Sequence, residues 1–158
     1  MKIKNNAFDW AALILPFVMC LVSAVLVLSR WSEIPDQIAI HFAADGTPDG
    51  TGSKSTLFVI LGIAAAMVIM MCVISHFPKM WNIPIKITDN NSFIVYRLMK
   101  YMLEFDQLLI SAMFCTFVLM TAYEVKIPMW FWIASVGGLL VGNLILIIIT
   151  IVKGKQNE

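Results

Sequence analysis

The residues best suited to chemistry lie in one polar stretch near the start of the chain. Residues 34–54 hold His41 together with three aspartates, Asp36, Asp45 and Asp49. A histidine and carboxylates can bind a metal ion, and a histidine can act as a general base. Residues 45–49 lack the alternating ligands and the terminal glutamate of a calcium loop. A serine or cysteine nucleophile with a plausible third partner does not stand out either. We therefore expect no enzyme, no catalytic residue, no metal and no cofactor.

The third interpretation of this stretch is a folded cap whose polar residues satisfy one another and present a recognition surface. Apolar and other residues alternate from Ile38 to Phe42, as in a strand. Because successive side chains point to opposite faces of a strand, Ile38, Ile40 and Phe42 should share one face. Ala39 and His41 should point the other way. If His41 pairs with a carboxylate, Asp36 and Asp49 are the two candidates.

Turn-forming residues follow the extended part. Asp45-Gly46 and Asp49-Gly50 are both turn signals, and Pro48 fits a turn position. An extended stretch followed by two tight turns predicts a compact cap lying on a membrane surface.

Apolar segments must position this cap. The chain is 60% hydrophobic and only 13% charged, with a mean hydropathy of +0.86, which is far from the roughly 25% charge of a soluble domain. Apolar runs of about 20 residues cross a bilayer as helices. Such runs cover residues 10–28, 57–74, 93–123 (crossing at 108–122) and 129–152. The predicted fold class is therefore an all-α membrane protein, a four-helix transmembrane bundle. A net charge of +1 gives no reason to expect a nucleic-acid partner.

The distribution of lysine and arginine predicts the orientation. Positively charged residues accumulate in cytoplasmic loops. Eight of the eleven lie on the side of the two termini: Lys2, Lys4, Lys79, Lys86, Arg97, Lys100, Lys153 and Lys155. The remaining three are Arg30, Lys54 and Lys126. We expect cytoplasmic N and C termini and an extracytoplasmic cap.

Two further features predict contacts with partners. Gly138 and Gly142 form a small-x-x-x-small pattern, which lets another helix approach closely, either within the monomer or in a homodimer. Asn143 should form an interhelical hydrogen bond. Residues that would face a cytoplasmic partner are Lys79, Lys86, Arg97 and Lys100. Asn91 or Ser92 offers an N-cap for the helix that follows.

The polar stretch also carries a family resemblance. Its I-P-D-Q-I, H-F, D-G-x-P-D-G and G-S-K segments resemble the signature of a bacterial membrane domain of unknown function, which occurs at the N-terminus of SdpI-type immunity proteins. The matching positions are Pro35, Asp36, Ile38, His41, Phe42, Gly46, Pro48, Asp49, Ser53 and Lys54. Ala39 stands where that family usually has a second proline. The resemblance assigns residues 1–75 to this domain and leaves 76–158 as a cytoplasmic loop with spans three and four.

The resemblance implies a function. SdpI-type proteins protect a producing cell against a secreted killing factor, and the family includes a receptor-like member. The implied function is an immunity or receptor-like protein of the bacterial cytoplasmic membrane that meets a secreted peptide toxin through the residues just listed and Gly50. The alternative is an accessory subunit of a transporter or other membrane complex. A transporter acting alone is disfavoured because the spans carry no charge in their middles.

Overall fold

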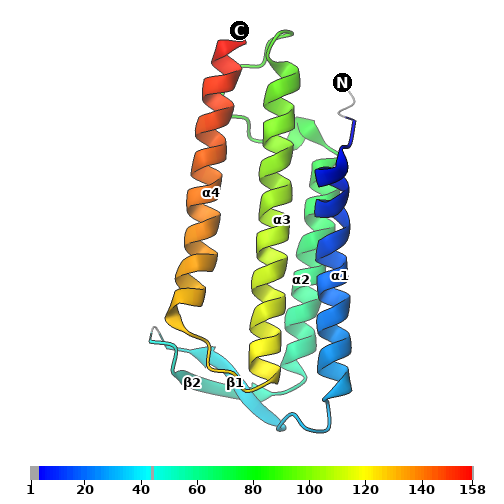
Figure 1. Ribbon diagram of the computed structural model, residues 1–158, viewed down its shortest axis with the longest axis vertical. Helices are drawn as coiled ribbons and strands as arrows, with labels where there is room; N and C mark the ends of the chain where they lie inside the picture. Colours follow the sequence, from blue (N-terminus) through cyan, green and yellow to red (C-terminus); the bar gives the residue numbers. More distant parts are fainter. Residues whose placement is uncertain (1–3, 44, 158) are drawn as a thin grey trace.

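A computed structural model describes residues 4–43 and 45–157. The elements, in order, are α1 (Ala7–Ser29), β1 (Gln37–Phe42), β2 (Pro48–Ser53), α2 (Thr56–Ser75), the short 3-10 helix η1 (Pro78–Met80), α3 (Ser92–Ala122) and α4 (Met129–Gln156). The four long helices run side by side, and β1 and β2 form an antiparallel hairpin across one end of them (Figure 1). We call this the hairpin end. The opposite end, where α1 begins and α4 ends, is the terminal end.

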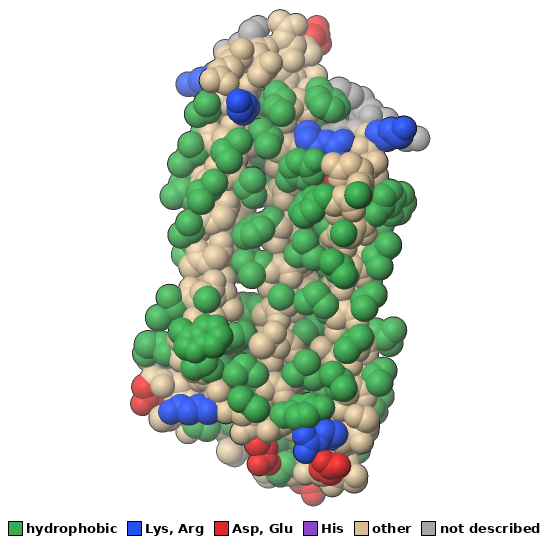
Figure 2. Space-filling view, viewed as in Figure 1, with side chains coloured by type: hydrophobic (Ala, Val, Ile, Leu, Met, Phe, Trp, Pro, Cys, Tyr) green, Lys and Arg blue, Asp and Glu red, His purple; other side chains and the backbone are tan. Residues whose placement is uncertain are grey.

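All four long helices are long and apolar enough to cross a membrane. Hydrophobic side chains cover the middle of the visible face, and charged side chains gather towards its two ends (Figure 2). Large apolar residues such as Leu21 and Leu140 are about two-thirds exposed. A surface of this kind suits lipid rather than water. The chain is a multi-pass membrane protein with a small two-stranded sheet.

The predicted spans agree with the helices to within four residues at every end. The largest difference is at the end of α4, which continues past residue 152 to Gln156. The predicted all-α class needs the two-stranded sheet added to it, because the extended stretch pairs with the residues that follow it.

The predicted N-cap residue of α3 is confirmed in position, but its side chain does not cap the helix. Asn91 occupies the cap position, but its side chain makes no capping hydrogen bond to α3. Its Oδ1 instead accepts from the backbone N–H of Thr88 at 2.8 Å, and its Nδ2 donates to the carbonyls of Lys86 and Gly154. Asn91 is fully buried, so it ties the α2–α3 connection to the last turns of α4.

Helix α3 is the centre of the bundle, because it packs against α1, α2 and α4. At the hairpin end a core of buried residues joins α1, α2, α3 and the hairpin: Val27, Ile34, Ile38, Leu57, Leu61, Cys115, Val118 and Ala122. Burying Ile34 and Ile38 in this core anchors the start of β1 on the helices.

The glycine pattern of α4 is used inside the monomer. A Cβ at Gly138 would lie 3.2 Å from Leu109, and one at Gly142 would lie 2.5 Å from the ring of Phe105. Both contacts are with α3, so these glycines let α3 and α4 approach each other.

The interhelical bond expected of Asn143 is confirmed. Its Nδ2 donates to Asp106 Oδ1 at 2.6 Å. Asp106 lies sixteen residues before the end of α3, or about 24 Å along a helix that rises 1.5 Å per residue. That depth is inside a hydrocarbon core of roughly 30 Å. Asp106 would therefore lie about 6 Å from the terminal-end limit of such a core, away from its middle, so it does not contradict the expectation that the spans carry no charge in their middles.

Candidate functional site

The hairpin contains two irregularities that decide where its side chains point. The register pairs Ala39 with Thr51 and His41 with Gly50, so it skips Ile40 on β1; it then skips Asp49 on β2. An extra residue of this kind is a β-bulge, which re-aims the side chains beside it. Ile40, which the register skips, is 37% exposed, whereas Ile38 is buried.

The turn of the hairpin uses one of the two predicted turn signals. Asp45 Oδ1 accepts hydrogen bonds from the backbone N–H and the hydroxyl of Thr47, at 2.9 and 2.6 Å. These bonds lower the pKa of the Asp45 carboxyl. Asp49 and Gly50, by contrast, lie inside β2, and Pro48 is its first residue. The second predicted turn is therefore wrong; a proline is tolerated at the start of a strand.

Gly46 is required by both its conformation and its surroundings. Its φ is +82°, in the region that side chains disfavour. A Cβ there would lie 2.7 Å from the carbonyl oxygen of Ile127, in the α3–α4 connection. The hairpin turn can therefore approach this connection only with glycine at position 46.

Lys54 fixes the connection between α1 and the hairpin. Its ammonium donates to the carbonyls of Trp31 and Ile34, both at 3.2 Å, and pairs with Asp36 at 3.0 Å. It also lies 5.0 Å from the centre of the Trp31 ring. The lysine side chain is 17% exposed, whereas that of Asp36 is 91% exposed. The two carbonyls, more than Asp36, hold Lys54 in place.

His41 and Asp49 form the polar pair on the outer face of the hairpin. His41 Nδ1 and Asp49 Oδ1 lie 2.5 Å apart, with side chains 74% and 45% exposed. Gly50 is opposite His41, and a Cβ there would lie 3.0 Å from the His41 Cβ. Of the two predicted partners of His41, the structure selects Asp49, which the bulge brings alongside it.

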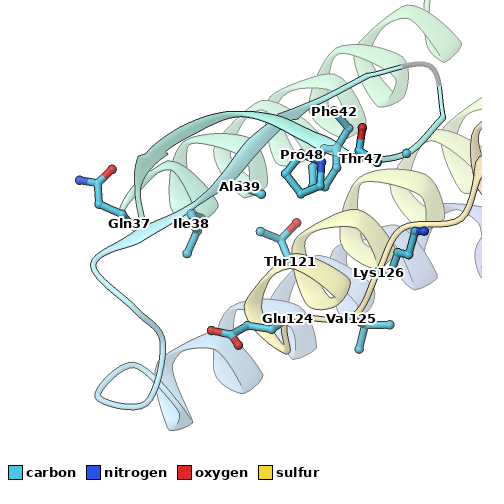
Figure 3. Close-up of a pocket in the computed structure, with 11 residues that line it drawn as sticks. Gln37, Ile38, Ala39, Phe42, Thr47, Pro48, Thr121, Glu124, Val125 and Lys126 are labelled. Atoms are coloured by element: carbon cyan, nitrogen blue, oxygen red, sulfur yellow. The ribbon is translucent and has the colours of Figure 1, made fainter.

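Between the hairpin and the α3–α4 connection lies a pocket of about 500 Å³ (Figure 3). The hairpin lines it with Gln37, Ile38, Ala39, Phe42, Gly46, Thr47 and Pro48, and the end of α3 and the connection line it with Thr121, Glu124, Val125 and Lys126. The Thr121 hydroxyl is buried and has no hydrogen-bond partner among the described residues. A pocket of this size, lined by both apolar and polar side chains, is a candidate ligand site.

The predicted site residues divide into two groups. Phe42, Gly46 and Pro48 line the pocket. Those that hold the hairpin or lie on its outside are Pro35, Asp36, His41, Asp49, Gly50, Ser53 and Lys54. Thr121 and residues 124–126 were not predicted, because they lie more than 65 residues after the polar stretch and carry no local motif.

The predicted cytoplasmic surface is not one surface. Lys79 and Lys86 are exposed. Arg97 and Lys100, however, turn into the bundle, with side chains 13% and 11% exposed. Arg97 donates to Asp9 Oδ2 at 2.8 Å, and Lys100 Nζ lies 3.4 Å from Asp9 Oδ1. The buried carboxylate of Asp9 draws these two cations inward.

One comparison with known proteins gives a match. Residues 18–67 match the model of a family described as a domain of unknown function, DUF1648. The match runs from within α1 through the hairpin into α2, just under a third of the chain. It contains the hairpin side of the pocket and omits the side formed by α3 and its connection. No curated protein and no solved structure matches the chain.

Proposed function

We propose that this chain is an immunity or receptor-like protein of the bacterial cytoplasmic membrane, with the hairpin outside and both termini in the cytoplasm. Its task is to recognise a secreted peptide toxin at the hairpin end and thereby protect the cell. The pocket beneath the hairpin carries this proposal. It combines residues of the SdpI-type signature with an unpartnered buried hydroxyl.

The lining of the pocket suits a peptide. Phe42, Pro48 and Val125 provide apolar contacts, and the Thr121 hydroxyl can bond to a backbone amide of the ligand. Glu124 and Lys126 add one charge of each sign at the same site. Leaving a buried hydroxyl unpaired costs about 1–3 kcal/mol, and a ligand that satisfies it recovers this free energy.

The test is survival of toxin-sensitive cells that express the protein and are challenged with the secreted toxin of an SdpI-type producer strain. Thr121→Val keeps the shape of the side chain and removes the hydroxyl, so protection should fall while the membrane level stays constant. Thr150→Val makes the same change in α4, outside the pocket lining, and serves as the matched control. Absence of protection by the unaltered protein would contradict the immunity function.

The orientation can be tested separately. Thr47→Cys and Lys79→Cys place thiols at the hairpin end and the terminal end. A membrane-impermeant maleimide added to intact cells should label the first and leave the second unlabelled until the cells are opened. The reverse pattern would put the pocket in the cytoplasm and exclude recognition of an external toxin there.

The alternative, an accessory subunit of a membrane complex, is supported by α4. This helix packs chiefly against α3, and only 11% of the residues in its most apolar stretch are buried. A partner helix could cover this face in place of lipid. Copurification of a second membrane protein after gentle cross-linking in native membranes would favour it.

A further inference from the structure

A second cavity lies at the terminal end, with a volume of about 720 Å³. It is bounded by α1, by the end of α2 with η1 and by α3. Its charged lining residues are Lys4, Asp9, Lys100 and Glu104, and its aromatic lining residues are Trp10 and Trp81. The pocket beneath the hairpin shares none of these residues, and the toxin-recognition proposal makes no use of them.

Two carboxyl groups in this cavity have unused bonding capacity. Asp9 is 2% exposed and Glu104 is 6% exposed. Asp9 Oδ1 and Glu104 Oε2 are both buried without a hydrogen-bond donor among the described residues. The two groups lie within hydrogen-bonding reach of each other, and in the form with both carboxyl groups ionised each is an acceptor only, so the pair then has no donor of its own. A buried acceptor atom without a hydrogen-bond donor is costly even where the charge of its group is paired. The site therefore calls for a group with N–H donors.

The neighbouring cations cannot supply these donors. Lys100 has three N–H bonds, and it faces Asn5 Oδ1 at 2.7 Å, Glu104 Oε1 at 3.3 Å and Asp9 Oδ1 at 3.4 Å. The last contact is an ion pair beyond normal hydrogen-bond geometry. Arg97 bonds to Asp9 Oδ2 and to the Lys4 carbonyl. Lys100 thus has an acceptor for each of its N–H bonds, Arg97 does not line the cavity, and Glu104 Oε2 has no partner among the described residues.

The aromatic walls suit a positively charged ligand. The Trp81 indole donates its N–H to the Ile74 carbonyl at 2.8 Å, which fixes the ring in place. Trp10 remains half exposed. Indole faces attract ammonium groups through their quadrupole. The exposed Lys4 lines the same cavity and supplies a cation for an anionic group carried next to the ammonium.

The cavity also lies at the depth of a lipid headgroup. Glu104 precedes the end of α3 by eighteen residues, and Asp9 precedes the end of α1 by twenty. At 1.5 Å per residue these are about 27 and 30 Å, so both side chains lie where a hydrocarbon core of roughly 30 Å ends. A headgroup of the leaflet at the terminal end can reach this level.

We propose that the terminal-end cavity binds a primary ammonium group, with Asp9 and Glu104 accepting its N–H bonds between the walls formed by Trp10 and Trp81. Two kinds of molecule carry this group. One is a phosphatidylethanolamine headgroup, whose phosphate would face Lys4, and the other is a free aromatic or aliphatic amine from the aqueous phase. Binding is non-covalent in both cases.

The test uses the full-length protein in detergent, with lipid binding measured by native mass spectrometry. Dioleoyl phosphatidylethanolamine and dioleoyl phosphatidylcholine differ only in three N-methyl groups, which remove the N–H donors. The ethanolamine lipid should bind about tenfold or more tightly, because hydrogen bonds to a charged group are involved. Glu104→Gln should remove most of this preference. Asp89→Asn, an exposed carboxylate at the same end, should keep it.

A second arm distinguishes the two sources of the ammonium. Benzylamine and benzyl alcohol are titrated against the same protein by calorimetry. Preference for the ethanolamine lipid identifies a headgroup, whereas saturable binding of benzylamine alone identifies a free amine. Equal binding of the two lipids together with no benzylamine binding would overturn the proposal, as would a preference that Glu104→Gln leaves unchanged. The lipid comparison uses the unaltered protein, so it stands even if that variant fails to fold.

Discussion

The two ends of the bundle use charge in opposite ways. At the hairpin end the ion pairs are short-range in sequence and open to water. His41 and Asp49 are eight residues apart and largely exposed, and Asp36, the partner of Lys54, is 91% exposed. Pairs of this kind contribute roughly 0–1 kcal/mol each. They shape the hairpin without stabilising the bundle.

At the terminal end the pairs are buried, and those of Asp9 are long-range in sequence. Asp9 joins Arg97 across 88 residues, and the side chains of Asp9, Lys100 and Glu104 are 1%, 11% and 7% exposed. Removing one partner of a buried pair leaves an uncompensated charge. The polar stretch that stands out in the sequence is therefore not the region whose ion pairs contribute most to the free energy of unfolding.

The largest effect of any single change is expected at Asp9. Asp9→Ala leaves Arg97 and Lys100 without their carboxylate and removes the capping box that Asp9 forms with Asn6. The free energy of unfolding in mixed micelles should fall by about 3–5 kcal/mol. Asp89→Ala, an exposed acid at the same end, is the control and should change it by less than about 0.5 kcal/mol. Equal effects would remove the contrast between buried and solvated charge.

Lys54 should give the next largest effect, because its bonds to two carbonyls count for more than its ion pair. Lys54→Met should lower the free energy of unfolding by about 1.5–3 kcal/mol, the range for hydrogen bonds to a charged group. Asp36→Ala should lower it by no more than about 1 kcal/mol. If the two variants are equally destabilised, the ion pair and not the carbonyl contacts holds the connection.

Gly46→Ala tests the close approach of the turn to the α3–α4 connection. The positive φ alone should cost about 1–2 kcal/mol, and the clash with the Ile127 carbonyl adds to it. Gly62→Ala, in α2 with open space around it, should be neutral or stabilising by up to about 1 kcal/mol. The free energy of unfolding is measured for both variants in the same detergent. If Gly46→Ala leaves it unchanged, the close contact with the Ile127 carbonyl is contradicted.

The smallest effect is expected at the outer face of the hairpin. His41→Ala removes an exposed pair and should change the free energy of unfolding by at most about 1 kcal/mol. Raising the salt concentration should shrink even this difference, because exposed charges are screened. A loss above 2 kcal/mol would show that the His41–Asp49 pair stabilises the fold.

Sequence patterns predicted the spans because an apolar run of membrane length can form few structures other than a membrane-spanning helix. The extended stretch from Ile38 to Phe42 could also be predicted, but its irregular pairing could not. The bulge at Ile40 depends on how β2 pairs with β1, which strand periodicity alone does not contain. The same bulged pairing explains why the turn signal at Asp49-Gly50 became part of a strand.

Contacts between residues far apart in the chain could not be predicted from the sequence. In the sequence, Asp9 is an acidic residue at the start of a helix. Arg97 and Lys100 are cations close to a predicted cytoplasmic loop. Only the packing of α1 on α3 brings them together. Thr121 likewise reads as an ordinary span residue until the hairpin folds over it. Spacing in the sequence carries no record of such tertiary neighbours.

Contact between a secreted toxin and the pocket beneath the hairpin is tested most directly by site-specific photo-crosslinking. A photoreactive amino acid is placed at Thr47, beside the pocket, or at Ser75, beside the terminal-end cavity. Cells carrying either variant are then exposed to the tagged toxin of an SdpI-type producer strain. A crosslink at position 47 and none at position 75 is the predicted result. Protection from the toxin without a crosslink at position 47 would contradict recognition by this pocket.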